Sequence, residues 1–131
     1  EVNMSISVVI VDDDVDTVDI FEEYLELQGF NVLAKGTDGK EAIELYEKYQ
    51  TDVLCSDIMM PNYDGFYAME NIRKKFPNAK IILVTADLTT DTKTKIEKSN
   101  ASAVIFKPYD IDKVVKTINE VVEGKNSTLE V

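Results

Sequence analysis

The chain of 131 residues contains no histidine, a single cysteine and no long apolar run. Without histidine, neither a His-based catalytic triad nor a His-ligated metal site can form, which leaves oxygen ligands for a hard cation. The lone Cys55 lies in an apolar run, is expected to be a buried small side chain, and cannot form an internal disulfide. We therefore expect a reducing, cytoplasmic location. No stretch approaches the roughly 20 apolar residues of a membrane span, and no signal-peptide pattern is found.

Positive charge is also scarce. Lysine and arginine number 14 against 25 aspartates and glutamates, which gives a net charge of −11. Such a balance disfavours the nucleic-acid backbone or an anionic membrane as a direct partner. The length is that of one domain with its own hydrophobic core.

Apolar runs alternate with amphipathic segments along the chain. The runs predict strands at 6–11, 30–34, 53–57, 80–84 and 103–106, and periodic apolar residues predict helices at 15–28, 39–49, 66–76, 88–99 and 111–123. Five strands alternating with five helices indicate an α/β fold with βαβ units and a parallel sheet. We expect an N-terminal extension at 1–5, one domain at 6–124, and a disordered tail at 125–131.

Capping residues support the helix boundaries. Gly29 and Asn100 stand where a left-handed residue ends a helix, and Asp38 with Glu41 forms a capping-box pattern. The segment 88–99 favours a helix least, because it holds four threonines and only Leu88 and Ile96 as apolar anchors.

The segment 53–65, VLCSDIMMPNYDG, brings one carboxylate to the end of a buried strand. Asp57 follows the apolar run, and the Pro, Asn, Asp and Gly residues after it are typical of a turn. Open parallel sheets bind ligands beyond the carboxyl ends of their strands. Asp57 is therefore the candidate reacting group.

Other polar residues follow neighbouring strands. Right-handed crossovers bring all strand ends to one edge of the sheet, so Asp12, Asp13, Thr85 and Lys107 are expected beside Asp57. Three carboxylates that close together repel unless a cation neutralises them, and Mg²⁺ prefers such oxygen ligands. A carboxylate nucleophile beside a metal, a hydroxyl and an ammonium group suits the acceptance of a phosphoryl group.

These residues stand in motifs that resemble the receiver domain of two-component response regulators, related to chemotaxis regulators. The motifs are VVIVDDD, SDIMMPNYDG, ILVTA and VIFKP, and the likeness runs through residues 6–123. The resemblance implies a doubly wound, flavodoxin-like sheet of strand order 2-1-3-4-5. It further implies that Asp57 is the phosphoacceptor, that Thr85 is a switch hydroxyl and that Lys107 contacts the phosphoryl group. Asp12, Asp13, Asp57 and the backbone carbonyl of Met59 would bind Mg²⁺ or Mn²⁺.

The same resemblance implies a signalling phosphoacceptor that assists only its own phosphorylation and dephosphorylation. Since this chain has no histidine, the phosphohistidine donor must belong to another protein, a sensor histidine kinase or a histidine phosphotransfer protein. Residues 86–100, with the last strand and helix, are the expected surface for an output partner or a dimer.

One position departs from the family pattern. Receiver domains usually have tyrosine or phenylalanine three residues before the lysine, where this chain has Val104. Strand alternation is expected to turn Phe106 to the other face of the sheet, so that Phe106 does not replace the missing ring.

Three alternatives remain. A haloacid-dehalogenase-type phosphatase shares the aspartate nucleophile, but no acidic pair on a further strand follows Lys107. A flavodoxin-like cofactor module needs Ser, Thr or Gly after its first strand, where three aspartates would repel a phosphate. The third alternative is a receiver that no longer accepts phosphate and serves as a docking surface.

Overall fold

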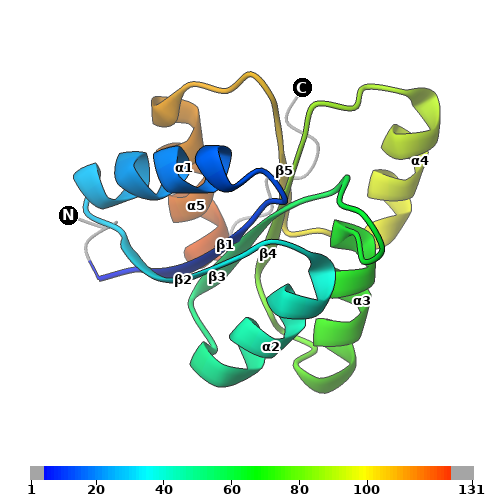
Figure 1. Cartoon of the computed structure of the whole chain (residues 1–131), viewed down its shortest axis with the longest axis horizontal. Coiled ribbons are helices and arrows are strands. Elements are labelled where there is room, and N and C mark those ends of the chain that lie inside the picture. Colours follow the sequence, from blue (N-terminus) through cyan, green and yellow to red (C-terminus); the bar gives the residue numbers. More distant parts are fainter. Residues whose placement is uncertain (1–4, 125–131) are drawn as a thin grey trace.

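The chain folds into one five-stranded parallel sheet with helices on both faces, as the computed structural model shows (Figure 1). The strand order is β2-β1-β3-β4-β5, which confirms the predicted doubly wound fold. The structure describes residues 5–124, so the predicted tail 125–131 and all of the predicted extension except Ser5 lie outside the described residues. The elements are β1 (Ser7–Val11), α1 (Val15–Leu27), β2 (Asn31–Gly36), α2 (Gly39–Tyr49), β3 (Val53–Asp57), α3 (Gly65–Lys75), β4 (Ile81–Thr85), α4 (Thr90–Ser99), β5 (Ala103–Phe106) and α5 (Ile111–Val122).

Each face of the sheet carries its own apolar core. Helices α1 and α5 cover one face through residues such as Leu25 and Ile118, both fully buried. Helices α2, α3 and α4 cover the other face, where Ile72 and Ile96 pack against the strands. The central strands β3 and β4 are buried along their whole length, as their continuous apolar sequences predict. Burial also raises the pKa of the Cys55 thiol to about 12, so it stays protonated as a core residue.

Capping residues fix the helix ends. Asp38 accepts a hydrogen bond from the backbone N–H of Glu41, which confirms the first half of the capping box. The Glu41 carboxylate reaches one residue further back than expected and accepts from the N–H and hydroxyl of Thr37. Gly29 and Asn100 adopt positive φ at the ends of α1 and α4, as predicted.

Helix α4 is held to the core by few side chains. Ile96 is buried, as the sequence predicts, but Leu88 is 56% exposed and is not the second anchor. The second buried residue of α4 is Thr92, whose hydroxyl donates to the carboxylate of Asp87 at 2.7 Å. Leu88 precedes the helix, and apolar spacing alone could not show that the polar Thr92 would take the inward position.

The end of α4 is tied by Arg73, from α3. The Arg73 guanidinium donates to the carbonyl oxygen of Asn100, which caps α4, and to the carbonyl oxygen of Ala79 before β4. It also donates to the hydroxyl of Ser102, which in turn accepts from the N–H of Ile81. This Arg73 clamp fastens the starts of β4 and β5 to α3, at the opposite end of the sheet from Asp57.

Candidate functional site

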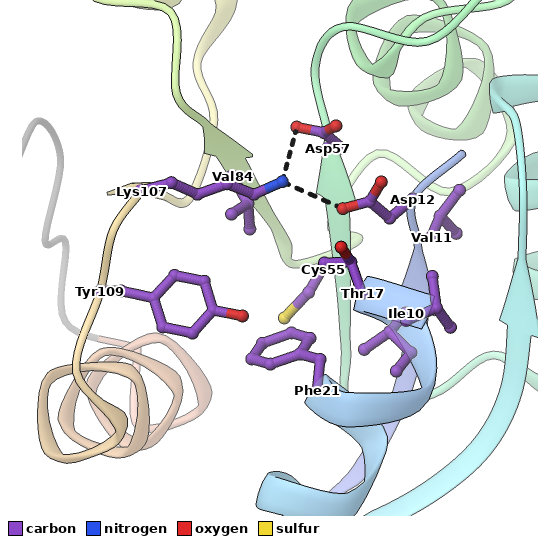
Figure 2. Close-up of a pocket in the computed structure, with 11 residues that line it drawn as sticks. Ile10, Val11, Asp12, Thr17, Phe21, Cys55, Asp57, Val84, Lys107 and Tyr109 are labelled. Carbon is purple, nitrogen blue, oxygen red and sulfur yellow. Dashed lines mark hydrogen bonds and ion pairs between the residues drawn. The ribbon is translucent and has the colours of Figure 1, made fainter. Parts of the chain in front are cut away.

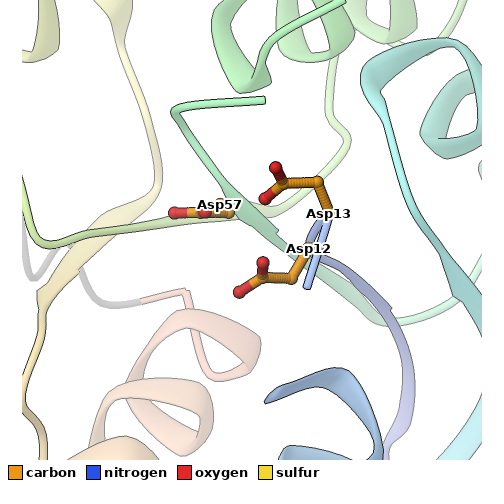
Figure 3. Close-up of side chains that lie close together, drawn as sticks. All are labelled: Asp12, Asp13 and Asp57. Carbon is orange, nitrogen blue, oxygen red and sulfur yellow. The ribbon is translucent and has the colours of Figure 1, made fainter. Parts of the chain in front are cut away.

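Three carboxylates gather at the carboxyl edge of the sheet, as predicted (Figure 3). Asp12 directly follows β1 and Asp57 ends β3, and these two strands are neighbours in the sheet. One carboxylate oxygen from each of Asp12, Asp13 and Asp57 lies within 4.8 Å of the others. Asp12 and Asp57 are buried, whereas Asp13 is exposed. The set is therefore open to solvent on the side of Asp13.

Backbone groups hold the two buried carboxylates in place. Asp12 accepts a hydrogen bond from the N–H of Asp14, the residue whose own side chain caps α1. Asp57 accepts from the N–H of Ile58 at 3.1 Å. The start of α3 lies close behind Asp57, because a Cβ on Gly65 would collide with the carbonyl oxygen of Asp57. Glycine is therefore required where α3 meets the end of β3.

Lys107 lies between the two buried carboxylates (Figure 2). Its Nζ atom is 3.0 Å from Asp12 Oδ2 and 3.7 Å from Asp57 Oδ1. Burial lowers the pKa of Lys107, but the hydrogen bond to Asp12 and the charge of Asp57 outweigh that effect, so its pKa is raised overall. Lys107 is thus a fixed positive charge at this edge, and its closer partner is Asp12.

The surroundings of Asp57 and Asp13 disfavour the ionised forms of these two acids. Burial, together with the charges of Asp12 and Asp13, raises the pKa of Asp57 from 3.8 to about 6, although Lys107 opposes the shift. The pKa of Asp13 is raised as well, by burial first and then by its neighbour Asp12. A divalent cation would relieve this repulsion, and carboxylate oxygens are the donors that Mg²⁺ prefers. The donor set therefore fits a hard cation.

Thr85 and Met59 take different places from the three acids. Thr85 ends β4 and is fully buried, and its hydroxyl accepts a hydrogen bond from the N–H of Asp87 at 2.9 Å. Asp87 in turn accepts from the N–H of Thr89 and the hydroxyl of Thr92. These bonds connect the end of β4 to the first turn of α4. Met59, whose backbone carbonyl is the predicted fourth metal ligand, lies in the loop after β3 and is 56% exposed.

The expectation for Phe106 was wrong. Val104 is buried in the core under α2, α3 and α4, and Phe106 packs against that same core. Residues two apart on a strand share a face, so Phe106 lies on the same side of the sheet as Val104. In the sheet register, Phe106 is the direct partner of Thr85. An aromatic ring therefore does flank Thr85. The ring lies on the neighbouring strand β5, two residues later in the sequence than the family pattern places it.

Sequence reasoning missed a small cavity beneath the acids (Figure 2). The cavity has a volume of about 20 Å³, room for one water molecule, and Thr17 and Tyr109 line it together with Asp12, Asp57 and Lys107. The Tyr109 ring packs against Phe21 with ring centroids 5.4 Å apart. Burial and the charge of Asp12 raise the pKa of Tyr109 to about 12, so its hydroxyl stays protonated. The signal was available, because Tyr109 stands two residues after Lys107.

Comparisons with known proteins agree with this arrangement. A family model described as the response regulator receiver domain matches residues 8–119. The chemotaxis protein CheY of Thermotoga maritima is 33% identical over 114 residues, which cover 87% of this chain and 95% of that protein. The transcriptional regulatory protein DegU of Brevibacillus brevis is 33% identical over 95 residues, which cover 72% of this chain and only 40% of DegU. The crystal structure of the CheX–CheY–BeF3–Mg²⁺ complex from Borrelia burgdorferi matches with a TM-score of 0.82 and 31% identity over 90% of both chains.

Proposed function

Because this chain belongs to the response regulator receiver family, we propose that it accepts a phosphoryl group on Asp57 in a reaction that needs Mg²⁺. Members of the family are signalling phosphoacceptors of two-component systems. One observation carries the proposal for this chain: three carboxylates and the Lys107 ammonium lie close together at one edge of the sheet. A core acid with a pKa near 6 beside a fixed ammonium is an unusual arrangement for a purely structural residue.

Each residue has a distinct part in the proposed transfer. A carboxylate oxygen of Asp57 attacks the phosphorus, the new P–O bond forms, and the bond from phosphorus to the donor nitrogen breaks. The Lys107 ammonium neutralises charge on the phosphoryl oxygens, and the Thr85 hydroxyl donates a hydrogen bond to one of them. Asp12, Asp13, Asp57 and the Met59 carbonyl would hold Mg²⁺ or Mn²⁺. When bound, the cation supplies positive charge that offsets the carboxylates.

The donor is a phosphohistidine of a separate protein, a sensor histidine kinase or a histidine phosphotransfer protein. The chain itself has no histidine to carry the phosphoryl group. Its role as a catalyst is limited to its own phosphorylation and dephosphorylation, without turnover of an independent substrate.

The hydrogen-bonded path from Thr85 to α4 supports a readout through residues 86–100. When the Thr85 hydroxyl turns toward a phosphoryl oxygen, it gives up its present geometry with the N–H of Asp87. Asp87 is bonded to Thr92 in the first turn of α4, so the two elements shift together. This surface, with β5 and α5, would then meet an output partner or a second copy.

Mass spectrometry after incubation with acetyl phosphate tests the proposal. The wild-type chain should gain the mass of one phosphoryl group in the presence of Mg²⁺, and either EDTA or the Asp57→Asn substitution should abolish the gain. Asp112→Asn, an exposed carboxylate in the first turn of α5, is the control and should be labelled normally. Labelling of Asp57→Asn at the wild-type level would show that another residue is the acceptor.

The need for a separate donor has its own test. Purified chain incubated with labelled ATP and Mg²⁺ should incorporate nothing until a histidine kinase is added. Incorporation from ATP by the chain alone would refute the proposed donor.

A further inference from the structure

A groove of about 740 Å³ lies between α3 and α4. Both helices cover the face of the sheet opposite α1 and α5 (Figure 1). Phe66, which is partly buried, and Met69 from the core contribute the apolar lining of the groove. The groove is of a size that holds a ligand side chain or a short helical segment. It does not include the acids or the lysine of the Asp57 site.

The charge of this groove is opposite to that of the chain. The chain as a whole has a net charge of −11. The groove is nevertheless lined by four cationic side chains and only two acidic ones, Asp64 and Glu70. The four cations are Arg73 and Lys74 from α3 and Lys95 and Lys98 from α4.

Three of these cations have no partner among residues 5–124. Arg73 is used in the clamp to Asn100, Ala79 and Ser102. Within that range, the ammonium groups of Lys74, Lys95 and Lys98 make no ion pair or hydrogen bond, and all three residues are exposed to solvent. One unpaired lysine therefore stands on the α3 wall and two on the α4 wall. The two acids of the lining, Asp64 and Glu70, make no ion pair with these lysines, and one oxygen of Asp64 accepts from the N–H of Tyr67 as the cap of α3.

We propose that the groove between α3 and α4 binds an acidic, amphipathic helix of a partner protein. Apolar side chains on one face of that helix would cover the exposed part of Phe66, and carboxylates along its two edges would face the lysines on the two walls. Charge complementarity favours this occupant, since a local positive groove on an acidic protein attracts acidic segments and repels basic ones. The proposal does not depend on phosphorylation of Asp57.

A designed peptide provides the probe. A fluorescent helical peptide of about 18 residues, with a leucine stripe flanked by glutamates, is titrated with the full chain and followed by anisotropy. We expect saturable binding that maps to α3 and α4 by amide chemical-shift changes. The same peptide with glutamine in place of glutamate is the first control and should bind more weakly by about tenfold.

Charge-reversing substitutions of lysine provide a matched pair. The double change Lys95→Glu and Lys98→Glu should weaken peptide binding by about tenfold or more, because it replaces attraction by repulsion at both sites. The double change Lys40→Glu and Lys93→Glu reverses the same number of charges at exposed lysines outside the groove and should alter affinity by less than about twofold. Far-UV circular dichroism checks that α4 remains folded in each variant.

Three results would overturn the proposal. Equal binding of the glutamate and glutamine peptides would show that charge does not select the occupant. Equal loss in the Lys40/Lys93 and the Lys95/Lys98 variants would show a general charge effect without a groove. In sedimentation velocity, the free chain should not self-associate through this groove. Self-association that the Lys95/Lys98 change abolishes would assign the groove to a second copy of the chain.

Discussion

Replacing Asp57 by asparagine should stabilise the metal-free protein, and the size of the effect should depend on pH. In the folded chain, burial and the neighbouring acids raise the pKa of Asp57 from 3.8 to about 6. The unfolded chain keeps the ordinary value. Between these two pKa values the folded state binds the proton and the unfolded state does not, so the free energy of unfolding falls as pH rises through this range.

The shift sets the expected magnitude. Each pKa unit corresponds to about 1.4 kcal/mol, so a shift of about two units costs the folded state about 3 kcal/mol once Asp57 is ionised. Asparagine resembles the protonated acid in shape and carries no charge. At pH 7.5 in EDTA, Asp57→Asn should therefore raise the free energy of unfolding by about 3 kcal/mol, and at pH 4, just above the pKa of the unfolded chain, the gain should fall to about 0.5 kcal/mol.

Urea denaturation at a series of pH values, in EDTA, measures this difference directly. Glu44→Gln removes an exposed carboxylate from α2 and should leave stability within about 0.5 kcal/mol at every pH. Saturating Mg²⁺ should narrow the gap between wild type and Asp57→Asn, because the cation stabilises the folded wild type by mass action. A gain in stability that is the same at pH 4 and pH 7.5 would refute the electrostatic explanation.

Three further changes test other parts of the structure. Asp13→Asn should raise the melting temperature in EDTA and weaken Mg²⁺ binding, as read by thermal melts and a metal titration; a lower melting temperature in EDTA would contradict the crowding of the acids. Gly65→Ala should lower the free energy of unfolding by about 1–3 kcal/mol and slow labelling by acetyl phosphate, because the added Cβ pushes against the backbone of Asp57; unchanged urea denaturation would count against that close approach. Thr92→Val should cost about 1 kcal/mol and speed hydrogen exchange in the first turn of α4, whereas Thr92→Ser keeps the hydroxyl bonded to Asp87 and should exchange as wild type does.

The fold could be predicted from the sequence because local and global signals agree. Buried strands such as β3 and β4 are continuous apolar runs, and the predicted helix caps Asp38 and Asn100 are found in those positions. The gathering of Asp12 and Asp57 followed from topology, since parallel strands end at one edge. Those inferences need only the order of the elements.

The parts that could not be predicted depend on packing between elements. The sequence gives no means to know that Lys107 lies closer to Asp12 than to Asp57, because that depends on side-chain rotamers. The inward position of Thr92 depends on its hydrogen bond to Asp87, which apolar periodicity does not register. The placement of Phe106 was an error of a different kind, since alternation applied from Val104 already puts both residues on one face.

The two ends of helix α4 are held in different ways. Its last turn is held through Asn100 to α3, whereas its first turn is joined to the sheet through the hydrogen bonds of Asp87. A displacement that starts at Thr85 would therefore rotate α4 about its carboxyl end and would not translate the helix along the sheet. Lys98 lies in the last turn of α4, close to the fixed end, so its position would change least, and Lys95 at the middle of the helix would move about half as far as the first turn. A partner in the α3/α4 groove could then stay bound through both signalling states while the opposite end of the helix moves.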